Sequence, residues 1–237
     1  EVGRIEIVRR GLEIVREAIG DDSYLLACGC PPEAALGPAD GERIGGDIST
    51  YFSTTRVQAR FLAARFWMNN RLFTADPDFL MVRGEATADD PEFHHNPYQW
   101  PGLADAAGSR SGPIWHDEGE PRIWATLVAL SGGALTLGDH VGKLNAVGRD
   151  MLRRAVELAR PVAARPIDLM HSALPTRWLR QDADRLVLGL VNWTDQPQVL
   201  TVKEFAGEGR EFWTGEVVRG EIVVPPHDAR AVLGPKG

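Results

Sequence analysis

The sequence predicts an α/β fold: the latter half of a (β/α)8 TIM barrel followed by a small antiparallel β-sandwich. Three observations lead to this prediction. Helix-like and strand-like segments alternate through the first two thirds of the 237 residues. The strand-like segments are almost wholly apolar and end in polar loops, as parallel strands covered by helices do. Beyond residue 164 short apolar runs are separated by Asp, Gly and Pro, which indicates antiparallel strands.

We therefore place a half-barrel at residues 1–162 and the β-sandwich at residues 163–237. A helix is expected at residues 3–19, because apolar residues recur on one face and Gly20 is a natural stop. An apolar strand follows at 24–27. Further helices are predicted at 54–71, 122–131 and 144–160, and short strands at 72–78 and 132–139. In the last part, strands are expected at 177–180, 185–193, 198–203, 211–218 and 221–224.

Residues 83–121 have the composition of a long loop, and such a loop in a compact domain is usually functional or disordered. Its aromatic residues favour a partly ordered lid: Phe93, Tyr98, Trp100 and Trp115.

The net charge of −7 argues against a nucleic-acid or anionic-membrane partner. No apolar run is long enough to span a bilayer. Cys28 and Cys30 lie too close together to staple a fold, and neither a metal site nor a cofactor is predicted. No secretion signal is visible, so we expect a cytoplasmic protein. The chain starts inside a predicted helix without an initiator methionine, which suggests a piece of a longer protein. Its seven tryptophans leave material for a homo-oligomer interface.

Polar side chains follow the predicted strands. In a barrel the active site lies at the carboxyl ends of the strands, so these residues are expected to reach one face. The glycines of segment 41–47, Gly46 among them, let backbone and ligand approach closely. The residues expected at this face are Cys28, Arg43, Gly46, Asp47, Asp76, Asp78 and Asp139.

The ordered set ACGCP, DGERIGGD, ADPDFLMV and LSGGALTLGDHVGKL resembles the melibiase-type retaining α-galactosidases of glycoside hydrolase family 36 and its relatives. The resemblance covers about residues 3–200. It implies that Asp47 is the acid/base and that Arg43 contacts the sugar hydroxyl next to the anomeric carbon. It further implies that Cys28 lines the sugar pocket. Asp76 and Asp78 would support the residues that contact the sugar without contacting it themselves. The implied substrate is an oligosaccharide or other α-galactoside.

One part of the family pattern is missing. The nucleophilic aspartate of these enzymes lies in a Lys-x-Asp motif upstream of the first helix, and the sequence has no such motif. We therefore expect the N-terminal half of the same protein to supply it and this chain alone to be inactive. Retention needs two carboxyl groups about 5–5.5 Å apart, one of which must hold a proton. A direct ion pair would favour the ionised form, so Arg43 is expected to point at the sugar and not at Asp47.

Each assignment has a structural alternative. Asp47 could cap a helix that begins near Ile48, Arg43 could be an ion-pair partner, and Cys28 could be a small buried residue. Trp100 and Trp115 could stack on a sugar or close the loop over the core. The spacing of His94, His95 and His116 does not support a metal site, and a solvated loop is the better interpretation.

Two functional alternatives also stay open. A galactosyl transglycosylase of the same family would let a sugar intercept the covalent intermediate in place of water. A non-catalytic carbohydrate-binding or scaffold protein would keep only the pocket.

Overall fold

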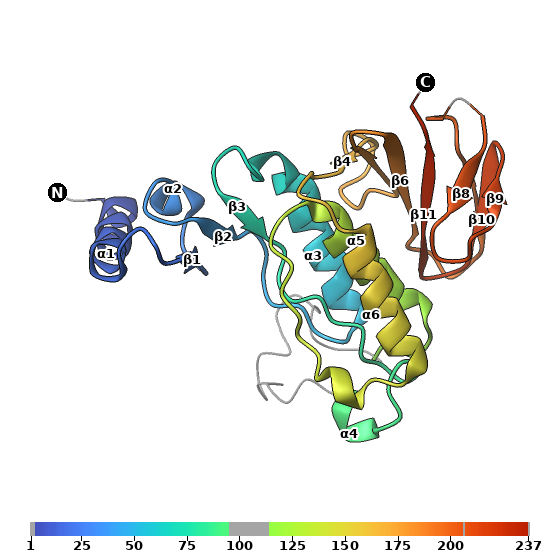
Figure 1. The fold of residues 1–237 in the computed structure, drawn as a ribbon, viewed down its shortest axis with the longest axis horizontal. Coiled ribbons are helices and arrows are strands. Elements are labelled where there is room, and N and C mark those ends of the chain that lie inside the picture. The colour runs from blue at the N-terminus through green and yellow to red at the C-terminus, as the bar shows by residue number, and fades with distance from the viewer. Residues whose placement is uncertain (1–2, 95–113, 206, 237) are drawn as a thin grey trace.

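The computed structural model describes residues 3–94, 114–205 and 207–236. Three parts follow one another along its long axis (Figure 1). A helix and a small parallel sheet lie at the N-terminal end, three long helices form the middle, and antiparallel strands form the C-terminal end. The predicted mixture of helices and sheets is thus confirmed. Among the described residues, no helix is both long enough and apolar enough to cross a membrane.

The parallel sheet has three short strands in the order β1-β2-β3. Helices connect the strands, as parallel pairing requires. The elements of this part are α1 (Arg4–Ile19), β1 (Leu26–Ala27), α2 (Pro32–Ala35), β2 (Gly41–Arg43), α3 (Phe52–Arg65), the 3-10 helix η1 (Phe66–Met68) and β3 (Thr74–Asp76).

Helix α1 has the predicted amphipathic pattern, yet none of its residues is buried. Its apolar side chains Ile5, Ile7 and Ile14 are 45%, 60% and 53% exposed. Arg16 anchors the helix through the Pro38 carbonyl and the Asp40 carboxylate. Leu12, in contrast, is partly buried against the small cluster of Ala27, Ala35 and Ala39, so α1 packs through part of its apolar side chains and exposes the others.

The middle part is organised around α5 (Gly119–Ser131). Every residue of α5 from Gly119 to Leu130 is buried except Arg122, as expected of a helix that is covered on all sides. It shares one hydrophobic core with α3, with α6 (Ala146–Leu158) and with one face of the C-terminal sheet. Two short helices complete this part, α4 (Pro91–His94) and the 3-10 helix η2 (Val141–Lys143).

The C-terminal part consists of a six-stranded antiparallel sheet in the order β4-β5-β6-β11-β8-β9 and a two-stranded sheet, β10-β7. Alternate residues of β6 face opposite sides. Val187 and Val191 join the core around α5, whereas Leu188 and Leu190 join a second core. The strands are β4 (Arg165–Pro166), β5 (Arg177–Gln181), β6 (Arg185–Asn192), β7 (Gln198–Thr201), β8 (Gly209–Glu211), β9 (Val217–Val218), β10 (Glu221–Val224) and β11 (Asp228–Pro235).

Several sequence-based boundaries are wrong. The helix predicted at 54–71 begins at Phe52 and gives way to η1 after Arg65. No strand forms at 132–139, where one parallel bridge joins Leu80 to Leu137. The run 211–218 contains the end of β8, a turn and β9. Strands β4 and β11 were not predicted, although β11 is central in its sheet.

Candidate functional site

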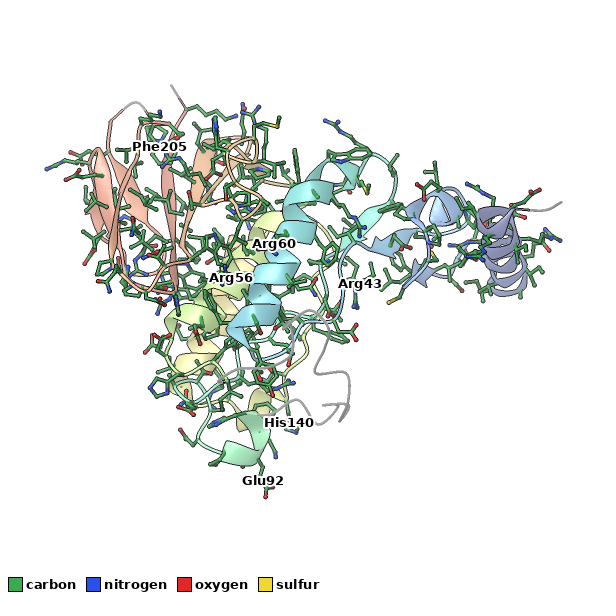
Figure 2. The ribbon with its side chains drawn as sticks, turned by 180° about the vertical axis from the view of Figure 1, so that it is seen from behind. Arg43, Arg56, Arg60, Glu92, His140 and Phe205 are labelled. Carbon is green, nitrogen blue, oxygen red and sulfur yellow. The ribbon has the colours of Figure 1, made fainter. Side chains whose placement is uncertain are left out.

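The parallel register of β2 and β3 places Arg43 directly beside Asp76. Both residues end their strands, so their side chains meet at the carboxyl edge of the sheet. Arg43 Nε donates to Asp76 Oδ2 at 2.6 Å, and Asp76 is 2% exposed. Figure 2 shows Arg43 at the junction between the helical middle part and the small parallel sheet.

Asp78 is the second carboxylate that binds Arg43. Its Oδ1 lies 3.0 Å from Arg43 Nη1, and its Oδ2 accepts the backbone N–H of Ile48 at 2.5 Å. The Asp78 N–H in turn donates to Asp76 Oδ1 at 2.9 Å, and its φ of 88° turns the chain sharply. Burial raises the pKa of Asp78, although the Ile48 N–H and the Arg43 charge oppose this. The two aspartates thus fix the direction of the guanidinium.

Asp47 lies at the open side of this group. Its side chain is 71% exposed, and its Oδ1 approaches Arg43 Nη1 to 3.7 Å. The tight contacts of Arg43 go to Asp76 and Asp78, at 2.6 and 3.0 Å, and the approach to Asp47 is longer. Burial alone lowers the pKa of Arg43, but its hydrogen bond with Asp76 and the charge of Asp78 raise the pKa overall.

The structure therefore brings together four of the predicted site residues: Arg43, Asp47, Asp76 and Asp78. Gly46 adjoins Asp47 and is exposed. Cys28 follows β1 directly and is also exposed, so it is not the small buried residue of the structural alternative. Its roles and those of the other residues toward a substrate stay predictions.

Glu42 is a member of this region that sequence reasoning missed. It precedes Arg43 on β2, is 1% exposed, and its Oε2 accepts the Cys30 thiol at 3.3 Å. Burial raises the pKa of Glu42 to about 7, and burial together with Glu42 raises the pKa of Cys30 to about 11. A charged residue inside so short a buried strand was the signal that could have identified it.

We expect Glu42→Gln to flatten the pH dependence of stability. Because the folded-state pKa lies above the ordinary 4.5, Glu42 favours folding below pH 4.5, and this contribution declines as the pH rises to about 7. The difference between the two pKa values corresponds to a loss on the order of 3 kcal/mol in the free energy of unfolding between pH 4.5 and about 7. Free energies of unfolding from urea titrations at pH 4.5 and 7.5 measure it. The exposed Glu221→Gln variant should keep the wild-type slope, and an equal slope in Glu42→Gln would contradict the assignment.

Asp139 does not join the group around Arg43, contrary to expectation. Its buried carboxylate binds Arg83 Nη1 at 2.9 Å and the backbone N–H of Val82 at 2.6 Å. Burial is the main reason why its pKa is raised. Asp139 therefore ties the segment after β3 to the segment before η2, a structural role.

The described parts of the 83–121 loop are docked on the core. Trp115 is fully buried, and its backbone N–H donates to the Thr50 carbonyl at 2.8 Å, so it closes the loop over the core. His94 is buried against the Ala88 carbonyl, and the exposed His116 binds Glu85. His95, Tyr98 and Trp100 lie outside the described residues.

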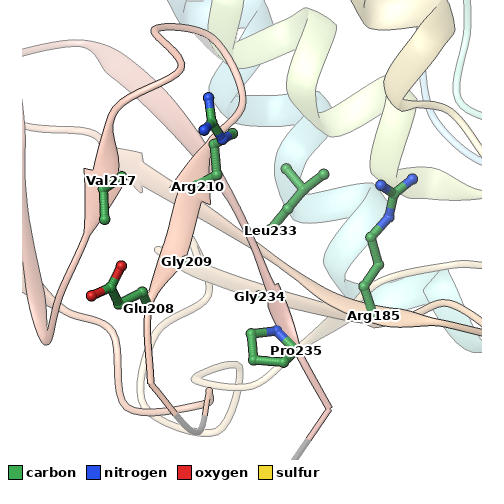
Figure 3. A pocket seen from close by; sticks show the side chains of 8 residues that line it. All are labelled: Arg185, Glu208, Gly209, Arg210, Val217, Leu233, Gly234 and Pro235. Carbon is green, nitrogen blue, oxygen red and sulfur yellow. The ribbon is translucent and has the colours of Figure 1, made fainter.

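A pocket of about 350 Å³ lies in the antiparallel part (Figure 3). Its lining combines the charged side chains Arg185, Glu208 and Arg210 with the apolar Leu233 and Pro235. None of the predicted site residues lines it. In the part of the chain that the structure describes, no three His, Cys, Asp or Glu side chains gather as metal ligands would.

No protein-family model matches the sequence. Solved structures do resemble the fold. One is a family GH27 β-L-arabinopyranosidase from Geobacillus stearothermophilus, in complex with arabinose. The match covers 97% of this chain and 55% of the arabinopyranosidase chain, with a TM-score of 0.69 and 15% sequence identity. α-Galactosidase I from Mortierella vinacea matches 99% of this chain and 66% of its own, with a TM-score of 0.66 and 13% identity.

α-Galactosidase from Saccharomyces cerevisiae, solved with raffinose, matches 99% of this chain and 69% of its own. Its TM-score is 0.63 at 11% identity. The chain thus spans between about half and two thirds of the length of these enzymes. At such identities the likeness defines the fold: the helices, the small parallel sheet and the antiparallel sheets are arranged as in glycoside hydrolases of the α-galactosidase type.

Proposed function

We propose that this chain supplies the acid/base side of a retaining glycoside hydrolase that acts on terminal α-linked galactose. The observation that carries the proposal is the group at the carboxyl edge of the parallel sheet. Asp76 and Asp78 hold the Arg43 guanidinium, and Asp47 projects beside it into solvent. The motifs that carry these residues resemble those of the melibiase-type enzymes, and the fold resembles that of α-galactosidases.

In this proposal Asp47 protonates the leaving oxygen and then activates the water that completes hydrolysis. Arg43 binds the hydroxyl next to the anomeric carbon, and Asp76 and Asp78 fix its direction. Cys28 and Gly46 border the sugar.

The nucleophile would come from the N-terminal half of the same protein, with β1, β2 and β3 as three strands of a joint barrel. Exposed apolar side chains of α1 support this arrangement, because Ile7 and Ile14 are more than half exposed. So does Leu26 of β1, which is 39% exposed at the free edge of the sheet.

The test is turnover of an aryl α-galactoside by the whole protein, including its N-terminal half, with the anomeric configuration of the first product followed by NMR. Release of α-galactose supports a retaining hydrolase, and release of β-galactose would contradict it. Products joined to an added acceptor sugar would indicate the transglycosylase instead. Binding of galactosides without turnover of any α-glycoside would leave only the carbohydrate-binding alternative.

A further inference from the structure

The peptide unit between Asp47 and Ile48 is held at both of its polar atoms. Gln58 Nε2, on α3, donates to the Asp47 carbonyl at 3.1 Å. Asp78, in the loop after β3, accepts the Ile48 N–H at 2.5 Å. Both side chains are buried, at 3% and 2% exposure. Two separate elements thus fix the orientation of this peptide plane, and with it the backbone from which the Asp47 side chain projects.

The Gln58 amide fits against glycines at its other end. A Cβ at Gly45 would collide with Gln58 Oε1, and a Cβ at Gly46 would lie 3.3 Å from Nε2. Gln58 Oε1 is buried and has no hydrogen-bond partner among the described residues. An unpaired buried acceptor costs about 1–3 kcal/mol, so an apolar side chain would fill this space at lower cost. The amide is useful here for the bond that its nitrogen makes.

Asp47 needs such a backbone anchor. Its side chain is 71% exposed, so little packing surrounds it. An acid/base carboxylate acts only within hydrogen-bond reach of the leaving oxygen, and a misplacement of about 1 Å can cost 10²-fold in rate. A fixed peptide plane restricts the positions that the carboxylate can reach.

We propose that Gln58 is a positioning residue for the acid/base carboxylate of Asp47. The inference rests on the proposed function. Gln58 acts through the Asp47 carbonyl and does not touch the substrate. Asp78 has the matching role at the Ile48 N–H and also holds Arg43, so it couples the positions of the two groups.

The main variant is Gln58→Met, which keeps the length of the side chain and removes both the donor and the unpaired acceptor. The second is Gln58→Glu, whose ionised form faces the Asp47 carbonyl without a proton to donate. Thr55→Val is the matched control, because Thr55 is also buried on α3 and its hydroxyl donates to the Tyr51 carbonyl at 3.4 Å. All are made in the whole protein.

The kinetic readout is kcat/KM for two α-galactosides, one with an alkyl and one with a dinitrophenyl leaving group. Both Gln58 variants should lose about 10- to 100-fold on the alkyl substrate, which needs protonation, and stay within about threefold on the dinitrophenyl substrate. Thr55→Val should match the wild type on both. Equal losses on the two substrates, or no loss on either, would overturn the proposal.

A second readout does not depend on activity. Amide hydrogen exchange at Ile48 should be at least about tenfold faster in Gln58→Met, while the melting temperature stays near that of the wild type. Unchanged exchange at Ile48 would overturn the proposal even if the wild-type protein hydrolyses no galactoside. If the wild type is inactive but exchange is faster in the variant, the proposed function is refuted. The result would still show that Gln58 fixes the peptide unit between Asp47 and Ile48.

Discussion

Replacing Asp47 by alanine is expected to lower kcat/KM for an α-galactoside with a poor leaving group by about 10²–10⁴-fold in the whole protein. Without the acid, the departing alkoxide must leave unprotonated. A dinitrophenyl leaving group is stable as an anion, so its departure should change far less. Steady-state kinetics on the two substrates measure the contrast.

The second step of the reaction provides an independent check. Water attacks the covalent intermediate only with help from a base, so Asp47→Ala should accumulate that intermediate with the dinitrophenyl substrate and show a burst of product. Azide, which needs no base, should restore turnover and yield a galactosyl azide. The exposed Asp184→Ala variant, in the turn between β5 and β6, serves as control. Wild-type kcat/KM of Asp47→Ala on the alkyl substrate would exclude Asp47 as the acid/base.

Replacing Arg180 by methionine is expected to reduce the free energy of unfolding by about 3–5 kcal/mol. Arg180 lies on β5 and is 1% exposed. Its Nε and Nη2 bind the two oxygens of Asp182 at 2.7 and 3.1 Å. It also donates to the carbonyls of Ala129, near the end of α5, and Leu158, at the end of α6. One guanidinium therefore joins the sheet to the C-terminal ends of two helices, where a cation is favoured.

Burial lowers the pKa of Arg180, and the hydrogen bond and charge of Asp182 oppose this. The methionine variant leaves Asp182 charged and 9% exposed, without its main partner. Adding Asp182→Leu should therefore recover part of the lost stability, because the isolated charge disappears. Arg153→Met is the matched control, since the Arg153–Glu157 pair is more than half exposed on both sides, and we expect little change. Urea denaturation measures all four proteins, and similar midpoints for Arg180→Met and Arg153→Met would contradict the prediction.

Local patterns were enough to predict most elements and four of the residues that meet at the candidate site. The amphipathic period of α1 and the apolar run of β6 identify their elements directly, and spacing after strands brings Arg43, Asp47, Asp76 and Asp78 together. Strand β11 escaped prediction because it begins Asp-Ala-Arg-Ala, a composition poor in β-branched residues. Its alanines Ala229 and Ala231 are fully buried against the core around α5, so tertiary packing and not propensity makes it a strand.

The residues of the site that were not predicted depend on contacts between segments far apart in the sequence, which no local pattern contains. Gln58 looks like any polar residue of a helix, and its contact exists because α3 approaches Gly45 closely. The predicted strand at 132–139 failed for a related reason. A Cβ at Gly133 would collide with the Ala75 carbonyl, so the extended segment is pressed onto β3 and does not continue a regular ladder.

The position of β11 has a consequence for synthesis of the protein. β11 pairs with β6 along eight residues and also with β8, but it comes after both in the chain. Until it leaves the ribosome, β4-β5-β6 and β8-β9 have no strand to join them, and α5 lacks part of its cover. The helical part can therefore not complete its core while translation of this segment continues. Because β11 contributes Ala229 and Ala231 to one core and Val232 to the other, its arrival would complete both cores in one late step.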